Sequence, residues 1–224
     1  MSLAKVGPDP QVIESAFVAA AGRASDLPPP TVVEVAFAGR SNVGKSSLMN
    51  ALLGRRRLVR TSSTPGCTRT VSFFDARFRS GDHLRLVDLP GYGYARRSRA
   101  ERSLWSALIE TYLLERSALR AVVVLLDVRR DVESSDLELI ELLAQPSRVA
   151  RPPLAIQVVA TKIDRLSRAA RQPRLAELSA RLGRSVGGVS VHDAATIDGL
   201  WKRLRSVPTL GHAESTQGRT EPSV

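Results

Sequence analysis

Hydrophobic residues follow two patterns along the chain: short apolar or every-other-residue runs, and longer stretches with helical spacing. The first pattern predicts strands and the second predicts amphipathic helices. We expect strands at residues 32–39, 71–78, 83–88, 121–127, 153–161 and 188–191. We expect helices at residues 44–54, 102–115, 134–145, 173–183 and 197–207. Because strands and helices mostly alternate, the sequence predicts an α/β fold with a mostly parallel, doubly wound sheet flanked by helices.

The two ends of the chain differ in composition from the middle. Residues 1–30 are mixed and end in "LPPP", which predicts a short helical or irregular arm followed by a linker. From Pro208 onward the sequence is polar and rich in Gly, Ser, Thr and Pro, so we expect residues 208–224 to be disordered. The sequence therefore predicts one folded domain over residues 31–207.

The stretch "FAGRSNVGKSS" lies between the first predicted strand and the first predicted helix, and it matches G-x-x-x-x-G-K-[ST] through Gly39, Gly44, Lys45 and Ser46. Backbone N–H groups of such a loop close on phosphate oxygens beside a helix N-terminus. The lysine reaches the β and γ phosphates, and the serine hydroxyl binds Mg²⁺. The other expected phosphate-site residues are Arg40, Ser41, Asn42, Val43 and Ser47. A glycine turn that only opens a helix is the alternative.

The motif "DLPG" ends the predicted strand at residues 83–88 and supplies a second phosphate contact. Asp88 can hold Mg²⁺ through a water molecule, and the N–H of Gly91 can meet a γ-phosphate oxygen. On its own this motif is a common turn. Its position after a phosphate loop and a strand favours the functional interpretation.

The turn "TKID" follows the predicted strand at residues 153–161 and supplies the candidate base-reading residues. The Asp164 carboxylate can accept two hydrogen bonds from the N1–H and N2–H₂ edge of guanine, whereas adenine offers no such pair. The stem of Lys162 would lie over the base. Thr161 replaces the asparagine of the usual N-K-x-D form of G proteins. The alternative is a strand-end turn with a solvated Lys and Asp.

A polar stretch, "TSSTPGCTRT" at Thr61–Thr70, falls where a GTPase has its first switch, between the first predicted helix and the second predicted strand. A threonine there can close on Mg²⁺ when the γ-phosphate is present. We expect Thr68 to be this residue, with Thr64 as the competitor and Pro65 and Gly66 beside the nucleotide. The candidate catalytic residues are Lys45, Thr68 and Gly91, and the candidate Mg²⁺ ligands are Ser46, Thr68 and Asp88.

Four segments resemble the EngB (YihA/YsxC) family of ribosome-assembly GTPases: "EVAFAGRSNVGKSSLMNALL", "RTSSTPGCTRTVSFF", "RLVDLPGYGYA" and "TKID". The similarity extends over residues 33–205 in order and spacing, and "DLPGYGYA" and the T-P-G-x-T switch are more particular to that family than the phosphate loop. The resemblance implies a Ras-like G domain of the P-loop NTPase class that binds GTP and GDP with Mg²⁺. It also implies work on the large (50S) ribosomal subunit during assembly, in the bacterial cytoplasm.

The sequence departs from the pattern of that family at several positions. Cys67 stands where arginine is usual in T-P-G-R-T, and Ser63 stands where lysine is common. The family's Ser-Ser or Ser-Ala guanine loop should fall near "SVHDAAT" at Ser190–Thr196, where no clean match exists. Asp193 and Ala194 are the nearest candidates for this last base contact.

Ras-type sites have a glutamine just after D-x-x-G that orients the attacking water, and here Tyr92 occupies that place. Tyrosine cannot act as the amide does, so we expect slow intrinsic hydrolysis and another means of positioning water. The family resembles GTPases with a hydrophobic residue at this place, some of which use K⁺. An asparagine in the phosphate loop, here Asn42, is a feature of that set, and K⁺ is therefore a candidate cofactor.

The net charge of the 224-residue chain is +11, and 29 of its 33 basic residues are arginines. Such an excess indicates an anionic partner, with nucleic acid as the first candidate. Two arginine runs flank the predicted switches and would contact a phosphate backbone in a nucleotide-dependent way. They are Arg55, Arg56, Arg57 and Arg60, and Arg96, Arg97, Arg99 and Arg102. A solvated basic rim is the alternative.

Other features of the sequence exclude several classes of protein. A single cysteine, Cys67, allows neither an internal disulfide nor a cysteine metal site, which fits a reducing cytoplasm. The longest apolar runs are far too short to span a bilayer, and we see no secretory signal. We therefore expect no membrane partner.

The combined prediction is a monomeric GTPase that binds the large ribosomal subunit and its rRNA and acts as a switch in its assembly. One rival is a P-loop kinase or ATPase, against which "TKID" argues. A second is an RNA-binding module with a purely structural nucleotide site. A third is a GTPase that serves tRNA modification, another RNA process or a membrane.

Overall fold

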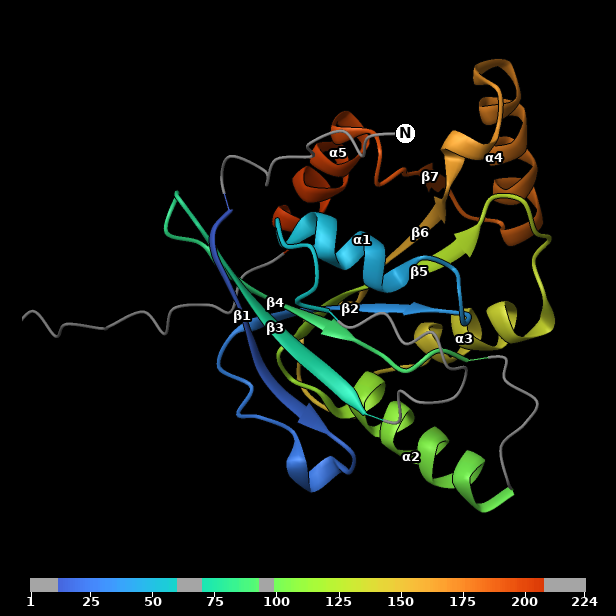
Figure 1. Cartoon of the computed structure of the whole chain (residues 1–224). Helices are drawn as coiled ribbons and strands as arrows, with labels where there is room; N and C mark the ends of the chain where they lie inside the picture. Colours follow the sequence, from blue (N-terminus) through green and yellow to red (C-terminus); the bar gives the residue numbers. More distant parts are fainter. Residues whose placement is uncertain (1–11, 60–69, 93–98, 208–224) are drawn as a thin grey trace, which may run out of the picture.

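The computed structural model describes residues 12–59, 70–92 and 99–207, with the backbone alone described for residues 99–106. Seven strands form one sheet in the order β1-β3-β4-β2-β5-β6-β7 (Figure 1). They are β1 Val12–Ala21, β2 Val33–Gly39, β3 Val71–Phe78, β4 His83–Asp88, β5 Leu119–Asp127, β6 Ala155–Thr161 and β7 Val186–Gly188. The pairs from β4 through β2, β5 and β6 to β7 are parallel, and β3 runs against both β1 and β4. The predicted mostly parallel, doubly wound sheet is confirmed.

Helices cover both faces of the sheet (Figure 1). They are α1 Lys45–Leu52, α2 Arg99–Glu115, α3 Ser134–Ala144, α4 Arg168–Leu182 and α5 Ala194–Arg205, with short 3₁₀ turns η1 Ala24–Asp26 and η2 Ile163–Arg165. Side chains of α1 and α5 form one hydrophobic core and those of α2, α3 and α4 form the other. Strand β2 contributes to both, because Phe37 faces the first core and Ala36 and Ala38 face the second.

The expectation of a helical or irregular arm before residue 31 is wrong for Val12–Ala21, which forms the edge strand β1. This strand pairs antiparallel with β3, and Phe17 lies opposite Phe74. Their rings pack edge to face, with 5.6 Å between the ring centroids. Most of its residues are exposed or only partly buried. An edge strand of this kind has no strict alternation of buried and exposed residues, so its sequence gives little periodic signal.

The ends of other predicted elements shift by a few residues. Helix α4 begins at Arg168 rather than at Pro173, because Ser167 caps it by accepting a hydrogen bond from the N–H of Ala170. Pro173 lies inside the helix and not at its start. The last strand, β7, is Val186–Gly188, so it overlaps the predicted strand at residues 188–191 only at Gly188. None of the helices that the structure describes is long and apolar enough to cross a membrane.

Candidate nucleotide-binding site

The loop between β2 and α1 has the backbone form that a phosphate-binding loop requires. A Cβ at Gly39 would lie 2.8 Å from Cγ1 of Val43 and 3.1 Å from Cβ of Leu125, so only glycine fits there. Gly44 has a φ of 104° and Asn42 a φ of 65°, both in the left-handed region. Glycine adopts this region freely and asparagine tolerates it. Backbone N–H groups in such turns form concave sites for anions.

Lys45 and Asp88 meet at the carboxyl edge of the sheet. Strands β2 and β4 are parallel neighbours, with Phe37 opposite Asp88. The Lys45 ammonium forms an ion pair with the Asp88 carboxylate, and the two side chains are only 10% and 6% exposed. Ser46 follows Lys45 in the first turn of α1. The predicted phosphate-binding lysine and two predicted Mg²⁺ ligands therefore lie at one edge.

The "DLPG" turn packs closely against the phosphate loop. A Cβ at Gly91 would lie 3.1 Å from Oγ and 3.3 Å from the backbone N of Ser41. The next residue, Tyr92, forms a parallel backbone bridge with Arg40. Gly91 is therefore held close to the phosphate loop, and its role toward a γ-phosphate stays a prediction.

Thr161 and Lys162 fasten the predicted base-reading turn to the phosphate loop. The Thr161 hydroxyl lies 2.6 Å from the backbone O of Val43 and 3.0 Å from that of Leu126. The Lys162 ammonium donates to the backbone O of Asn42 at 2.7 Å. The residue that replaces the usual asparagine is therefore a buried link between β6 and the loop.

Asp164 projects beside the loop that follows β7. The Ser190 hydroxyl donates a 2.7 Å hydrogen bond to Oδ1 of Asp164. Burial alone would raise the pKa of Asp164, but this hydrogen bond is the largest of several effects that together hold it below the ordinary carboxylate value. Asp164 is therefore ionised at neutral pH, as an acceptor for the guanine edge must be.

Ser190 contacts the predicted base-reading residue Asp164, whereas the sequence analysis chose Asp193 and Ala194 in this segment. Asp193 is the N-cap of α5, and its carboxylate accepts a hydrogen bond from the N–H of Ala195. Ala194 begins that helix and is exposed. The position of Ser190 in the sequence could have identified it, because Ser190 follows the last strand just as Asp164 follows β6.

Asp127, at the end of β5, is a further residue that the sequence reading missed. Its carboxylate accepts a 2.9 Å hydrogen bond from the ammonium of Lys162 and two from the guanidinium of Arg129. Burial acts to raise the pKa of Asp127, but the hydrogen bonds from Arg129 and Lys162 hold it well below its ordinary value. Asp127 thereby fixes the lysine whose stem is predicted to cover the base.

Several predicted residues lie outside the part of the chain that the structure describes. They are Pro65, Gly66 and Thr68 of the first switch, its competitor Thr64, and the arginines Arg60, Arg96 and Arg97. The side chains of Arg99 and Arg102 are likewise not described. The roles of these residues stay predictions.

The donor set suits Mg²⁺ delivered with a nucleotide. The described residues include no group of three or more His, Cys, Asp and Glu side chains that could hold a metal ion by themselves. Nucleotide-bound Mg²⁺ takes one or two protein ligands, because phosphates and water molecules complete its octahedron. The Ser46 hydroxyl and the Asp88 carboxylate fit such an ion.

The phosphate loop, the Lys45–Asp88 pair and the Asp164 turn occupy the carboxyl edge of a doubly wound sheet, which defines a Ras-like G domain and a GTPase. The family described as "50S ribosome-binding GTPase" matches residues 34–162. A probable GTP-binding protein EngB of Myxococcus xanthus is 46% identical over 172 residues, covering 75% of this chain and 81% of that protein. A probable GTP-binding protein EngB of Anaeromyxobacter sp. (strain Fw109-5) is 41% identical over 216 residues, covering 93% of this chain and 97% of that protein. The chain belongs to the EngB family of GTP-binding proteins.

Solved structures agree on the fold. The crystal structure of a probable GTP-binding protein engB has a TM-score of 0.58 at 20% identity, covering 77% of this chain and 97% of that one. Era in complex with MgGDPNP and nucleotides 1506–1542 of 16S ribosomal RNA has a TM-score of 0.64 at 22% identity, covering 80% and 58%. The predicted resemblance to EngB and the predicted Ras-like fold are confirmed.

Proposed function

We propose that this GTPase is a nucleotide-controlled switch in the assembly of the large (50S) ribosomal subunit. The observation that carries the proposal is the match of residues 34–162 to a family of 50S ribosome-binding GTPases, over the segment that holds the assembled phosphate site. Era, a fold neighbour, has been solved with ribosomal RNA. A role in another RNA process, such as tRNA modification, is the alternative.

The residues at the sheet edge have distinct roles in this proposal. Lys45 binds the β and γ phosphates, and the Gly91 N–H meets the γ-phosphate. Ser46 and Asp88, with Thr68 from the first switch, hold Mg²⁺, which when bound offsets the negative charge of the phosphates. Asp164 selects guanine, and Ser190 keeps its carboxylate ionised and oriented.

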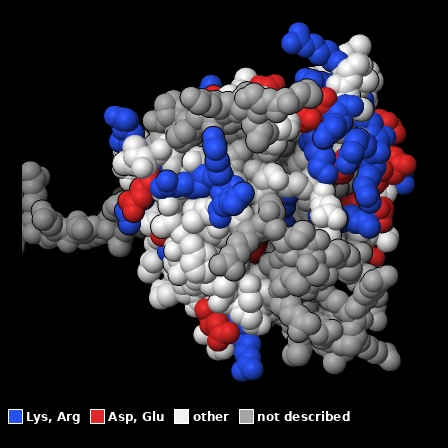
Figure 2. Space-filling view, in the orientation of Figure 1, with Lys and Arg blue, Asp and Glu red and all other residues white. Residues whose placement is uncertain are grey.

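Exposed arginines offer a surface for the RNA backbone. Arg55, Arg56 and Arg57 are exposed directly after α1, in the segment that leads toward the first switch. Basic side chains also gather on the side of the molecule where α4 lies (Figure 2), and that helix carries four arginines. Lys and Arg contacts with phosphates release counterions, so binding to ribosomal RNA should weaken steeply with salt.

Depletion of the protein in its host tests the proposal. Ribosome profiles on sucrose gradients should show fewer mature large subunits and an accumulating precursor. Complementation with the Asp164→Asn variant should fail. The control variant Asp131→Asn should restore the profile, because Asp131 is an exposed residue of the β5–α3 loop. Normal levels of mature large subunits after depletion would count against the proposal and favour another RNA process.

A further inference from the structure

Tyr92 occupies the place of the water-orienting glutamine, but its side chain is engaged elsewhere. Its hydroxyl donates a 2.9 Å hydrogen bond to Oδ1 of Asp136, in the first turn of α3. Burial and the neighbouring Asp136 carboxylate raise the pKa of Tyr92 well above its ordinary value, so the phenol remains a donor at any working pH. The residue after Gly91 is therefore tied to a helix.

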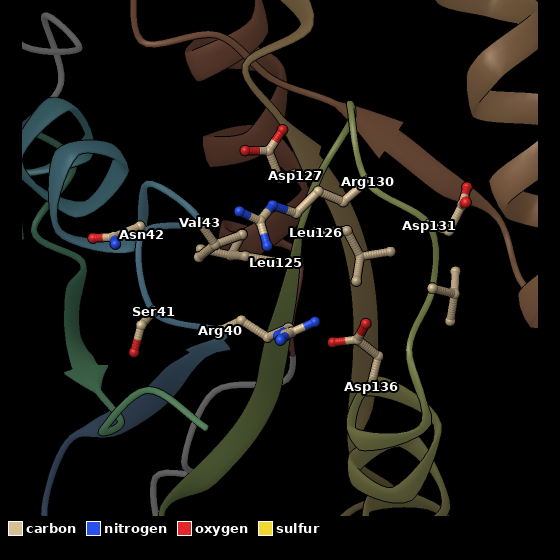
Figure 3. A pocket seen from close by; sticks show the side chains of 11 residues that line it. Arg40, Ser41, Asn42, Val43, Leu125, Leu126, Asp127, Arg130, Asp131 and Asp136 are labelled. Carbon is tan, nitrogen blue, oxygen red and sulfur yellow. The ribbon is translucent and has the colours of Figure 1, made fainter. Parts of the chain in front are cut away.

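Asp136 is itself held in place. It is only 2% exposed, and its Oδ2 accepts a 3.0 Å hydrogen bond from the backbone N–H of Glu133 in a capping box. Glu133 also forms an ion pair with Arg40 of the phosphate loop. Figure 3 shows the Arg40 side chain extending from that loop toward Asp136. Because Oδ2 of Asp136 is held by the Glu133 N–H and the side chain is buried, Oδ1 is left as the acceptor for Tyr92.

These contacts form a closed set that joins the start of the phosphate loop, the residue after Gly91 and the first turn of α3. Arg40 reaches α3 through Glu133, Tyr92 reaches α3 through Asp136, and the backbones of Arg40 and Tyr92 form a bridge. Gly91 directly precedes the bridge residue Tyr92 in the turn after β4, and a Cβ placed on it would lie 3.1 Å from Oγ of Ser41. A shift of Tyr92 would therefore move Gly91 relative to the loop.

We propose that Tyr92 and Asp136 are positioning residues for GTP, whose hydrogen bond holds the Gly91 N–H in place for the γ-phosphate. The inference rests on the proposed role of Gly91 in the phosphate site. GDP has no γ-phosphate, so loss of the hydrogen bond affects GTP and leaves GDP binding unchanged. The tyrosine then does not replace the glutamine in orienting water but sets the turn that senses the third phosphate.

The Tyr92→Phe variant removes the hydroxyl and keeps the ring. We expect three- to tenfold weaker binding of a non-hydrolysable GTP analogue, the range that one hydrogen bond can account for, with unchanged GDP affinity and a lower kcat. The matched control is Tyr112→Phe, because Tyr112 donates a similar 3.0 Å hydrogen bond to a buried carboxylate, Glu34, near the opposite end of β2. That variant should lower stability without changing the ratio of GTP to GDP affinity.

Variants at Asp136 test whether the two residues act through each other. Asp136→Asn retains an oxygen that can accept from Tyr92 and should preserve more of the preference for the GTP analogue than Asp136→Ala does. The double variant Tyr92→Phe/Asp136→Ala should be no worse in this ratio than Asp136→Ala alone.

The inference is overturned if Tyr92→Phe leaves the ratio of GTP-analogue to GDP affinity unchanged, or weakens both nucleotides equally. The Gly91→Ala variant separates the role of Tyr92 from the role of Gly91. If Gly91→Ala lowers analogue affinity and Tyr92→Phe does not, only the positioning role fails. If neither variant changes the ratio, the proposed role of Gly91 fails as well.

Discussion

The hydroxyl of Thr161 lies 2.6 Å from the backbone oxygen of Val43 and joins the end of β6 to the phosphate loop. The two residues are far apart in the sequence, and the contact is buried. A threonine in place of the usual asparagine therefore still ties the base-reading turn to the loop that cradles phosphate. Together with the hydrogen bond from Lys162 to the backbone oxygen of Asn42, this contact joins the two halves of the predicted nucleotide site.

Replacing Thr161 by valine should weaken this link while preserving shape. The backbone oxygens of Val43 and Leu126 would lose their donor, so we expect a loss of about 1 kcal/mol in the free energy of unfolding. The affinities for GDP and GTP should fall together, because both nucleotides contact the base site and the phosphate site and depend on their relative position. Urea unfolding and nucleotide titration measure the two effects.

The control for that substitution is Ser147→Ala. The Ser147 hydroxyl also lies near two backbone oxygens, those of Leu114 and Val149, at 3.1 and 2.8 Å. Ser147→Ala should lower the free energy of unfolding by a comparable amount without changing nucleotide affinity. Equal nucleotide affinities in wild type and Thr161→Val would contradict the proposed role of the link.

Asn42 offers a test of potassium dependence. Its φ of 65° suits asparagine for backbone reasons alone, which is a sufficient explanation for the residue. The Asn42→Gly variant keeps access to that conformation and removes only the amide. If the amide binds K⁺, replacing NaCl by KCl should raise the GTPase rate of wild type and not that of Asn42→Gly. A wild-type rate that is equal in the two salts would rule out the potassium hypothesis.

Two glycine substitutions should change stability in opposite directions. Gly39→Ala places a Cβ 2.8 Å from Val43 Cγ1 and should destabilise the fold by about 1–3 kcal/mol, with loss of nucleotide binding. Gly199 lies inside α5, where a Cβ would meet Arg203 only at 4.0 Å. Gly199→Ala should stabilise the protein by about 0.5–1 kcal/mol, because alanine favours helices. Thermal unfolding of both variants tests the close packing at Gly39, and equal stabilities would contradict it.

Asp127 should contribute to the pH dependence of stability. Its lowered folded-state pKa means that, below the ordinary carboxylate value of about 4, the unfolded chain binds a proton that the folded chain does not. The contribution is therefore complete above that value and is lost as the pH falls toward the folded-state pKa. Unfolding free energies of wild type and Asp127→Asn should differ most at neutral pH and converge in acid.

The comparison for Asp127→Asn is Asp131→Asn, because Asp131 lies on the loop that follows Asp127 and its side chain is 71% exposed. Its stability should follow that of wild type across the pH range. A constant difference between wild type and Asp127→Asn down to pH 3 would show that the carboxylate does not act through its ionisation.

Much of the fold could be predicted because buried parallel strands and amphipathic helices have distinct hydrophobic periods. The bounds of β3 and β4 match the predicted strands. Strand β1 was missed because it lies at an edge, where only one neighbour and part of one face constrain its side chains. Local sequence does not encode that pairing.

The phosphate loop and Asp164 could be predicted because each is a contiguous motif whose spacing carries the chemistry. Ser190, Asp127 and Asp136 could not be identified in this way. Each acts on a residue more than 25 positions away, and only the folded sheet and helices bring the partners together. For Tyr92 the sequence showed what the residue cannot do, and the structure showed which side chain it contacts.

Cosedimentation with purified 50S and 30S subunits tests the central claim most directly. In the presence of a non-hydrolysable GTP analogue, the protein should pellet with 50S subunits, and binding should weaken with added salt because phosphate contacts release counterions. With GDP, or with 30S subunits, little protein should pellet. Equal binding in both nucleotide states, or a preference for 30S subunits, would contradict the account.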